Sequence, residues 1–183
     1  MKRIDQVTCA LCFWALMIQL PGANSFAALR QTRQQAGPCR TRPENLQFEF
    51  WVGQWDVKQT GAESGASVGA SKIESHADNC IILENWESPG FNGKSWNFYD
   101  LGTHKWRQIW LDVTGRRAEF SGEYKDSAMR FEGEAITGKG IKVKSRMTFF
   151  NLGPDKVRQF AERSTDDGKT WTTSVDYTYF RKK

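Results

Sequence analysis

The chain has little of what most enzyme classes need. Among its 183 residues are only two histidines and four cysteines. A phosphate-binding loop and a dinucleotide fingerprint are both missing from the sequence. His104 falls in a Gly-Thr-His-Lys turn, a poor position for an axial haem ligand. We therefore expect no metal site and no cofactor.

Long apolar runs are equally scarce, and the only clear one lies at the N-terminus. Val7–Leu20 is apolar over about 14 residues, which is short for a membrane span. Lys2 and Arg3 precede it, and small residues follow it. This pattern predicts a secretory signal over residues 1–27, a secreted or periplasmic protein, and no membrane span after cleavage. An uncleaved anchor is the alternative.

Charge of one sign is not concentrated anywhere. The chain has 26 Lys and Arg against 21 Asp and Glu, a net charge of +5, and the two signs interleave along its length. A nucleic-acid-binding protein would gather its basic residues on one face or arm, so we expect no nucleic-acid partner.

The cysteines indicate an oxidised protein. Cys9 and Cys12 would leave with the signal, and Cys39 and Cys80 would remain as an even pair in an oxidising compartment. We expect these two to form a disulfide that closes a loop of roughly 40 residues. Two free thiols are the alternative.

The remaining sequence favours β-structure. Residues 28–45 are polar and are expected to be a flexible N-terminal segment, and residues 46–183 a barrel domain. Ten short segments are rich in aromatic and β-branched residues and are separated by tight-turn signals. The expected strands are 50–60, 72–76, 81–86, 94–99, 105–112, 118–124, 129–135, 141–151, 157–164 and 170–181. Neighbouring strands of this kind pair antiparallel, which predicts an all-β, up-and-down (meander) barrel of about 8–10 strands.

Three local patterns add detail. One helical turn is expected just before the first strand, within Leu46–Trp51. The segment Gly61–Ala70 is rich in Gly, Ala and Ser and is expected to be a mobile loop over one mouth of the barrel. Gly53-Gln54-Trp55 matches the Gly-x-Trp opening strand of lipocalin-like barrels, where the Trp plugs the closed end.

A second motif predicts a turn. Ser164–Trp171 fits Ser-x-Asp-x-Gly-x-Thr-Trp, which resembles the Asp box of sialidases. In this hairpin Asp166 would accept hydrogen bonds from turn amides, and Gly168 would take a positive φ. A sialidase needs several such repeats and a much longer chain, so the role is expected to be structural.

Alternation along the strands suggests a ligand pocket. Trp106, Gln108, Trp110 and Asp112 share one strand face, which offers flat apolar area with a directional amide. The candidate ligand-binding residues are Trp55, Trp86, Asn97, Tyr99, Gln108, Trp110, Arg146 and Gln159. The same tryptophans could instead fill a solid core, because barrels of this size can be filled or hollow. A shift of one residue in strand register would also exchange the inner and outer faces.

Glu84 is the one carboxylate that stands out. It lies between Ile82 and Trp86 on an otherwise apolar strand face, so it could be an internal acid or base. The alternative is a structural ion pair with an arginine such as Arg146.

The motifs together resemble a family of small exported bacterial proteins of uncharacterised function, described as lipocalin-like or calycin-like barrels. The resemblance spans about residues 50–181 and rests on 50–57, 82–86, 93–100, 105–112, 121–123, 146–149 and the Ser164–Trp171 hairpin. It implies a barrel and export, but no activity. Ala161 departs from the family pattern, because a bulky aromatic is expected there.

Three functions are compatible with these features. The first is reversible binding of a small apolar or amphipathic molecule. The second is an enzyme of isomerase or cyclase type that uses Glu84 to move a proton. The third is a filled barrel that makes protein contacts through its surface, which predicts an exposed aromatic patch and no cavity.

Overall fold

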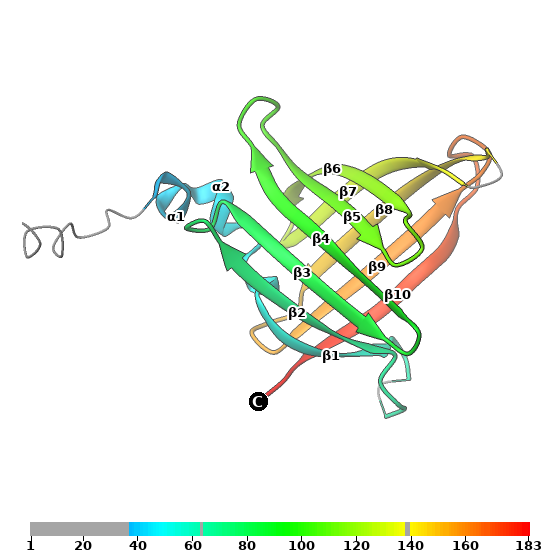
Figure 1. The fold of residues 1–183 in the computed structure, drawn as a ribbon, viewed down its shortest axis with the longest axis horizontal. Helices are drawn as coiled ribbons and strands as arrows, with labels where there is room; N and C mark the ends of the chain where they lie inside the picture. Colours follow the sequence, from blue (N-terminus) through cyan, green and yellow to red (C-terminus); the bar gives the residue numbers. More distant parts are fainter. Residues whose placement is uncertain (1–36, 63, 138–139) are drawn as a thin grey trace, which may run out of the picture. The chain divides into compact units, whose positions relative to one another are not determined.

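The structure, a computed structural model, describes residues 37–183 apart from 63, 138 and 139. The predicted secretory signal lies outside the described residues. The described chain consists of three short helices followed by ten strands (Figure 1). The helices are α1 (Pro38–Thr41), α2 (Pro43–Leu46) and the 3-10 helix η2 (Glu49–Trp51). The strands are β1 (Gly53–Gln59), β2 (Gly69–His76), β3 (Ile81–Ser88), β4 (Phe91–Asp100), β5 (Lys105–Asp112), β6 (Arg117–Lys125), β7 (Ala128–Ile136), β8 (Lys142–Asn151), β9 (Lys156–Ser164) and β10 (Thr172–Arg181).

The strands form a closed antiparallel barrel, as the sequence predicts. Each strand pairs with its neighbours in the chain, and β1 pairs with β10 to close the sheet. This up-and-down order is consistent with a lipocalin-like barrel. Closure leaves no strand edge unpaired, so the ten short strands need no second sheet to cover an edge.

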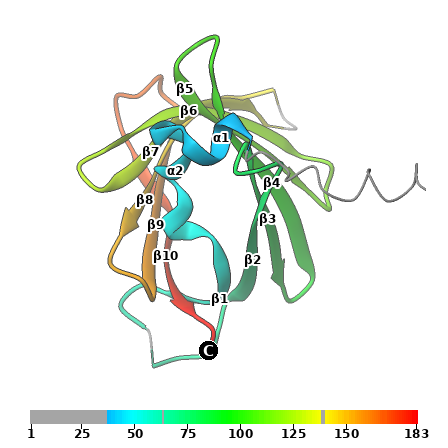
Figure 2. The same cartoon turned by 90° about the vertical axis from the view of Figure 1, so that its left-hand side faces the viewer.

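One half of the barrel is filled with aromatic side chains. Phe48 stacks on Trp51 with ring centres 4.9 Å apart, and Phe149 lies 4.6 Å from Trp51. Phe48 and Trp51 come from the chain just before β1, which enters this end of the barrel (Figure 2). All three side chains are fully buried. The helical segment is therefore the plug of the closed end and not a separate appendage.

The Gly-x-Trp motif has the predicted structural role. Trp55 is fully buried in the closed half, and its Nε1 donates to the Trp51 carbonyl oxygen at 2.9 Å. The Arg181 guanidinium lies 4.2 Å from the Trp55 ring centre and occupies the place where a Cβ of residue 53 would stand. Gly53 is needed because the backbone there is approached by an arginine side chain.

The N-terminal segment is more regular than the sequence indicates. Of the flexible segment predicted over residues 28–45, residues 28–36 lie outside the described residues, while residues 38–41 form α1 and residues 43–45 belong to α2. Each helix begins with a proline, which is preorganised for a first helical turn. Cys39 of α1 is bonded to Cys80, as predicted, across 41 residues of sequence. This crosslink holds α1 against the β2–β3 turn.

No helix in the described part of the chain is both long and apolar enough to cross a membrane.

Candidate functional site

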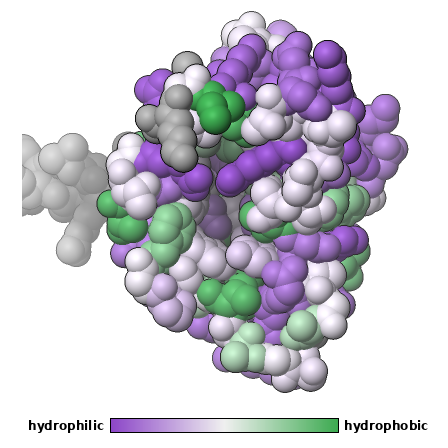
Figure 3. Space-filling view, turned by 90° about the vertical axis from the view of Figure 1, so that its right-hand side faces the viewer, coloured by the Kyte–Doolittle hydropathy of each residue, from purple (hydrophilic) through white to green (hydrophobic). Residues whose placement is uncertain are grey.

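The open half of the barrel contains a cavity of about 380 Å³. It lies at the end opposite the helices, and Figure 3, which faces this end, shows a recess in the surface with hydrophilic residues around and within it. Its walls are mainly apolar and come from most of the strands. They include Trp86, Phe91, Trp110, Phe120, Val143, Met147, Val175 and Tyr177. Drug-sized ligands occupy pockets of about 300–1,000 Å³, so this volume suits a small molecule.

Glycines in the sheet create the space. Three wall aromatics approach a glycine of a neighbouring strand closely, with ring atoms under 3 Å from the place of a Cβ: Trp86 at Gly69, Trp110 at Gly93 and Phe120 at Gly133. A Cβ on Gly93 would stand 2.6 Å from Cη2 of Trp110, and a Cβ on Gly69 would stand 2.7 Å from Cζ2 of Trp86. Because these glycines carry no side chain, the indole rings lie along the wall and the lumen stays open.

Glu84 of β3 is the buried charge of the cavity. Its side chain lines the inner part of the cavity, and the residue is only 6% exposed. Oε1 accepts a hydrogen bond from Ser71 Oγ at 3.0 Å, and Oε2 accepts one from Ser95 Oγ at 2.8 Å. The described residues supply no ion-pair partner for it. Burial raises the pKa of Glu84 to about 7, although the two serine hydrogen bonds act in the opposite direction.

Two glutamines complete the polar floor. Gln108 donates through Nε2 to Asn97 Oδ1 at 2.8 Å. Gln159 accepts a hydrogen bond from Tyr179 Oη at 2.7 Å, and its Nε2 lies 3.0 Å from Met147 Sδ, a weak acceptor. Both amides line the cavity. A bound molecule could therefore find apolar walls and a few directional polar groups.

The mouth of the cavity carries positive charge. Arg116 and Arg163 both line it. Arg116 donates from Nε to Asp112 Oδ2 at 3.1 Å. Burial acts to raise the pKa of Asp112, but hydrogen bonds from Thr114 and Trp110, with the Arg116 charge, hold it at about 2. Partial desolvation and the neighbouring Arg116 lower the pKa of Arg163. An anionic or strongly polar group would be favoured at this end.

The structure brings together only some of the residues named from the sequence. Five line the cavity: Glu84, Trp86, Gln108, Trp110 and Gln159. Trp55 lies in the filled half instead. Asn97 is fully buried beneath the cavity floor, and Tyr99 packs on Trp106 with ring centres 6.2 Å apart. Trp55, Asn97 and Tyr99 therefore face the barrel interior without lining the cavity.

The expectation for Arg146 is wrong. Its side chain points to the outer face of β8, where Nε donates to Glu162 Oε2 at 2.6 Å. The guanidinium stacks 4.3 Å from the ring centre of Trp171. Arg146 therefore meets no ligand head group in the interior and does not pair with Glu84. Alternation identified the strand correctly but not which face of it is inside.

Sequence reasoning missed several members of the site. Ser71 falls between the expected loop, residues 61–70, and the expected strand, residues 72–76, whereas β2 already begins at Gly69. Tyr177 and Tyr179 line the cavity from β10. A signal for them was present, because Val175, Tyr177 and Tyr179 alternate with polar residues along a strand.

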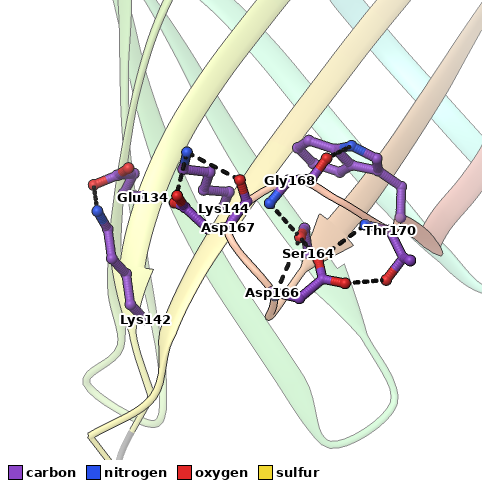
Figure 4. A network of polar contacts seen from close by, with 9 residues as sticks. Glu134, Lys142, Lys144, Ser164, Asp166, Asp167, Gly168 and Thr170 are labelled. Carbon is purple, nitrogen blue, oxygen red and sulfur yellow. Dashed lines mark hydrogen bonds and ion pairs between the residues drawn. The ribbon is translucent and has the colours of Figure 1, made fainter.

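The Ser164–Trp171 hairpin has the predicted structural role (Figure 4). Asp166 Oδ1 accepts from the Thr170 amide at 2.9 Å, and Oδ2 accepts from Thr170 Oγ1 at 2.7 Å. The Gly168 amide donates to Ser164 Oγ at 2.8 Å, and Gly168 has a φ of +92°. The side chains of Ser164 and Asp166 therefore make their hydrogen bonds within the hairpin itself.

The interior combines features of the filled and hollow alternatives, because the helix-capped half is packed and the opposite half holds the cavity. Within residues 37–183, leaving aside the three undescribed positions, His, Cys, Asp and Glu side chains nowhere gather into a group of three that could hold a metal ion. Neither a protein-family model nor a curated protein matches the sequence.

Proposed function

We propose that this protein reversibly binds a small apolar or amphipathic molecule in the open half of its barrel. The observation that carries the proposal is the cavity of about 380 Å³ with aromatic walls and a polar floor. Apolar walls supply most of the binding free energy through buried area, and a few fixed polar groups orient the ligand. The arginines at the mouth suit a polar end that remains near solvent.

We also propose that binding takes place in a secreted or periplasmic compartment. The Cys39–Cys80 disulfide and the predicted signal over residues 1–27 support this location.

A fluorescence titration tests the binding proposal. N-phenyl-1-naphthylamine is an apolar probe of suitable size whose emission rises in apolar surroundings, and tryptophan can transfer energy to it. We expect saturable binding with energy transfer from Trp110, so the Trp110→Phe variant should transfer less. The matched control is Trp96→Phe on β4, because Trp96 is 37% exposed and lies outside the cavity. Equal losses in both variants, or no saturation, would count against a site in the cavity.

Arg146→Ala provides a second control. Because Arg146 contacts Glu162 and Trp171 on the outer face, its removal should leave probe affinity unchanged. A clear loss of affinity in this variant would place the ligand outside the barrel.

A second candidate function is favoured by one specific observation. A carboxyl with a pKa of about 7, facing a shielded cavity, could move a proton on a bound substrate, as in an isomerase or cyclase. Glu84→Gln would then bind the same molecule without converting it. Recovery of chemically unchanged ligand from the wild-type protein after long incubation would argue for binding alone.

A further inference from the structure

One backbone carbonyl fixes the direction of the hydrogen bonds that join Gln108, Asn97 and Ser95 at the cavity floor. Asn97 Nδ2 lies 3.0 Å from the carbonyl oxygen of Ile82, which can only accept. The amide of Asn97 therefore presents its nitrogen to Ile82 and its oxygen on the opposite side. Its Oδ1 must accept, and the donor is Nε2 of Gln108.

The same orientation determines the state of the neighbouring serine. Asn97 Nδ2 also lies 3.0 Å from Ser95 Oγ, which accepts this hydrogen bond. The hydroxyl proton of Ser95 is then directed at Glu84 Oε2, 2.8 Å away. Ser71 Oγ donates a second hydrogen bond, to Glu84 Oε1 at 3.0 Å. The donors therefore point from Gln108 through Asn97 and Ser95 toward Glu84. Glu84 accepts hydrogen bonds at both of its carboxylate oxygens.

This polarity leaves acceptors at the inner end of the cavity. Gln108 uses one N–H of its Nε2 on Asn97, which leaves its Oε1 as an acceptor and its second N–H as a donor. Glu84 presents carboxylate oxygens to the same space and has no cation beside it among the described residues. The donors at the floor are the second N–H of Gln108 and, on the β9 side, Nε2 of Gln159.

We infer that the ligand places a hydrogen-bond donor, an amine or a hydroxyl, at the inner end of the cavity against Glu84. A protonated amine is the best match, because it would neutralise a desolvated carboxylate and form a charge-assisted hydrogen bond with it. A carboxylate in the same position would meet the like charge of ionised Glu84, so the floor selects against it. This inference rests on the proposed binding function and adds the chemical class and orientation of the ligand.

Three probes of equal chain length test the inference: octylamine, 1-octanol and octanoate. Each is titrated by calorimetry into the wild type, Glu84→Gln and the matched control Glu87→Gln. Glu87 belongs to the same strand but is exposed on the outer face. We expect octylamine to bind about tenfold or more weakly to Glu84→Gln, a typical loss for a charge-assisted hydrogen bond. Octanoate, whose head would face the arginines at the mouth, should change little, and Glu87→Gln should behave as wild type.

The pH dependence in the wild type gives a second test that needs no variant. Tyr177 and Tyr179 of β10 are the titratable side chains facing Glu84 in the cavity, while β2 and β4 present Ser71 and Ser95. Burial raises the pKa of Tyr179 well above its usual range, so it stays neutral. Glu84 should ionise between about pH 6 and pH 8, and the charge that appears at the cavity floor should raise octylamine affinity about tenfold.

The outcomes separate the two proposals. If Glu84→Gln weakens octylamine binding no more than octanoate binding, and if octylamine affinity does not change with pH, the inference is wrong. Binding in the cavity would still stand. If none of the three probes binds saturably and the naphthylamine probe also fails, the proposed function itself is wrong. Tight octanoate binding that Glu84→Gln strengthens would show a carboxylate at the floor, and it would also overturn the inference.

Discussion

Ionisation of Glu84 should make the protein less stable as the pH rises. The carboxyl has an ordinary pKa of 4.5 and a pKa of about 7 in the folded protein, raised by burial. The native state therefore holds this proton more tightly than the unfolded chain does. The contribution of this group to the free energy of unfolding is fully present below about pH 4.5 and is lost as the pH rises through about 7.

The size of the effect follows from the shift. A difference of about 2.5 pKa units, at about 1.4 kcal/mol per unit, amounts to roughly 3 kcal/mol. Asp112 titrates with the opposite sign, because its pKa is lowered to about 2 and its contribution is lost in acid. This second effect is common to the wild type and a Glu84 variant, so it cancels when their stabilities are subtracted.

Glu84→Gln isolates the effect. The amide oxygen can keep the hydrogen bond from Ser95, whose proton is fixed in direction by Asn97. Its NH₂ would face Ser71, whose hydroxyl can rotate to accept. The variant should therefore fold, and it should gain about 3 kcal/mol relative to the wild type between about pH 4.5 and pH 8.5.

Urea unfolding, followed by tryptophan fluorescence across that pH range, measures the difference directly. The stability of the wild type minus that of Glu84→Gln should fall by about 3 kcal/mol as the pH rises. A constant difference at all pH values would refute the reasoning, because it would show that Glu84 has the same pKa in the folded and unfolded states.

Three further predictions concern the framework of the barrel. Replacing Cys39 and Cys80 with serine should lower the free energy of unfolding by about 3–4 kcal/mol, measured with urea, because the crosslink closes a 41-residue separation; an unchanged midpoint would contradict this. Gly93→Ala should cost about 1–3 kcal/mol in the same assay and weaken probe binding, because the new Cβ collides with Trp110 and pushes its ring into the cavity; a variant with wild-type stability and affinity would refute the collision. Asp166→Ala should lower the thermal unfolding midpoint by removing the hydrogen bonds to Thr170, with no change in probe affinity; a loss of binding would give the hairpin a role in the site.

The barrel could be predicted from sequence because its signals are local. Aromatic and β-branched residues alternate with polar ones, and each strand ends at a turn signal. Short turns leave antiparallel pairing of neighbours as the simplest topology, and β1–β10 pairing follows from closure. The start of β2 was missed because Gly69 and Ala70 look like the end of a loop. Residue 69 is a glycine because the Trp86 ring lies where a Cβ would stand.

The site was harder to predict because it depends on which strand face points inward. Glu84 could be singled out, since a carboxylate between Ile82 and Trp86 is unusual on any apolar face. The placement of Arg146 failed because a period of two gives two faces without saying which one is inner. Its partners Glu162 and Trp171 lie on another strand and in a hairpin, so only the register reveals them.

The depth of each interior residue was also invisible in the sequence. Trp55 and Trp86 are both inward-facing tryptophans, yet one belongs to the closed-end core and the other to the cavity wall. The difference depends on the plug formed by Phe48 and Trp51, which precede the barrel in the chain. Contacts of this kind are set by the three-dimensional packing of distant segments.

The most direct test of the binding proposal is the stoichiometry of probe uptake with the cavity open and narrowed. Ala118 lines the cavity, so Ala118→Phe should place a ring in it and narrow it without altering the outer surface. Equilibrium dialysis of N-phenyl-1-naphthylamine should give one molecule bound per wild-type chain and clearly less for the narrowed variant, provided that both are folded by circular dichroism. Equal uptake by the two proteins would contradict a ligand site inside the barrel.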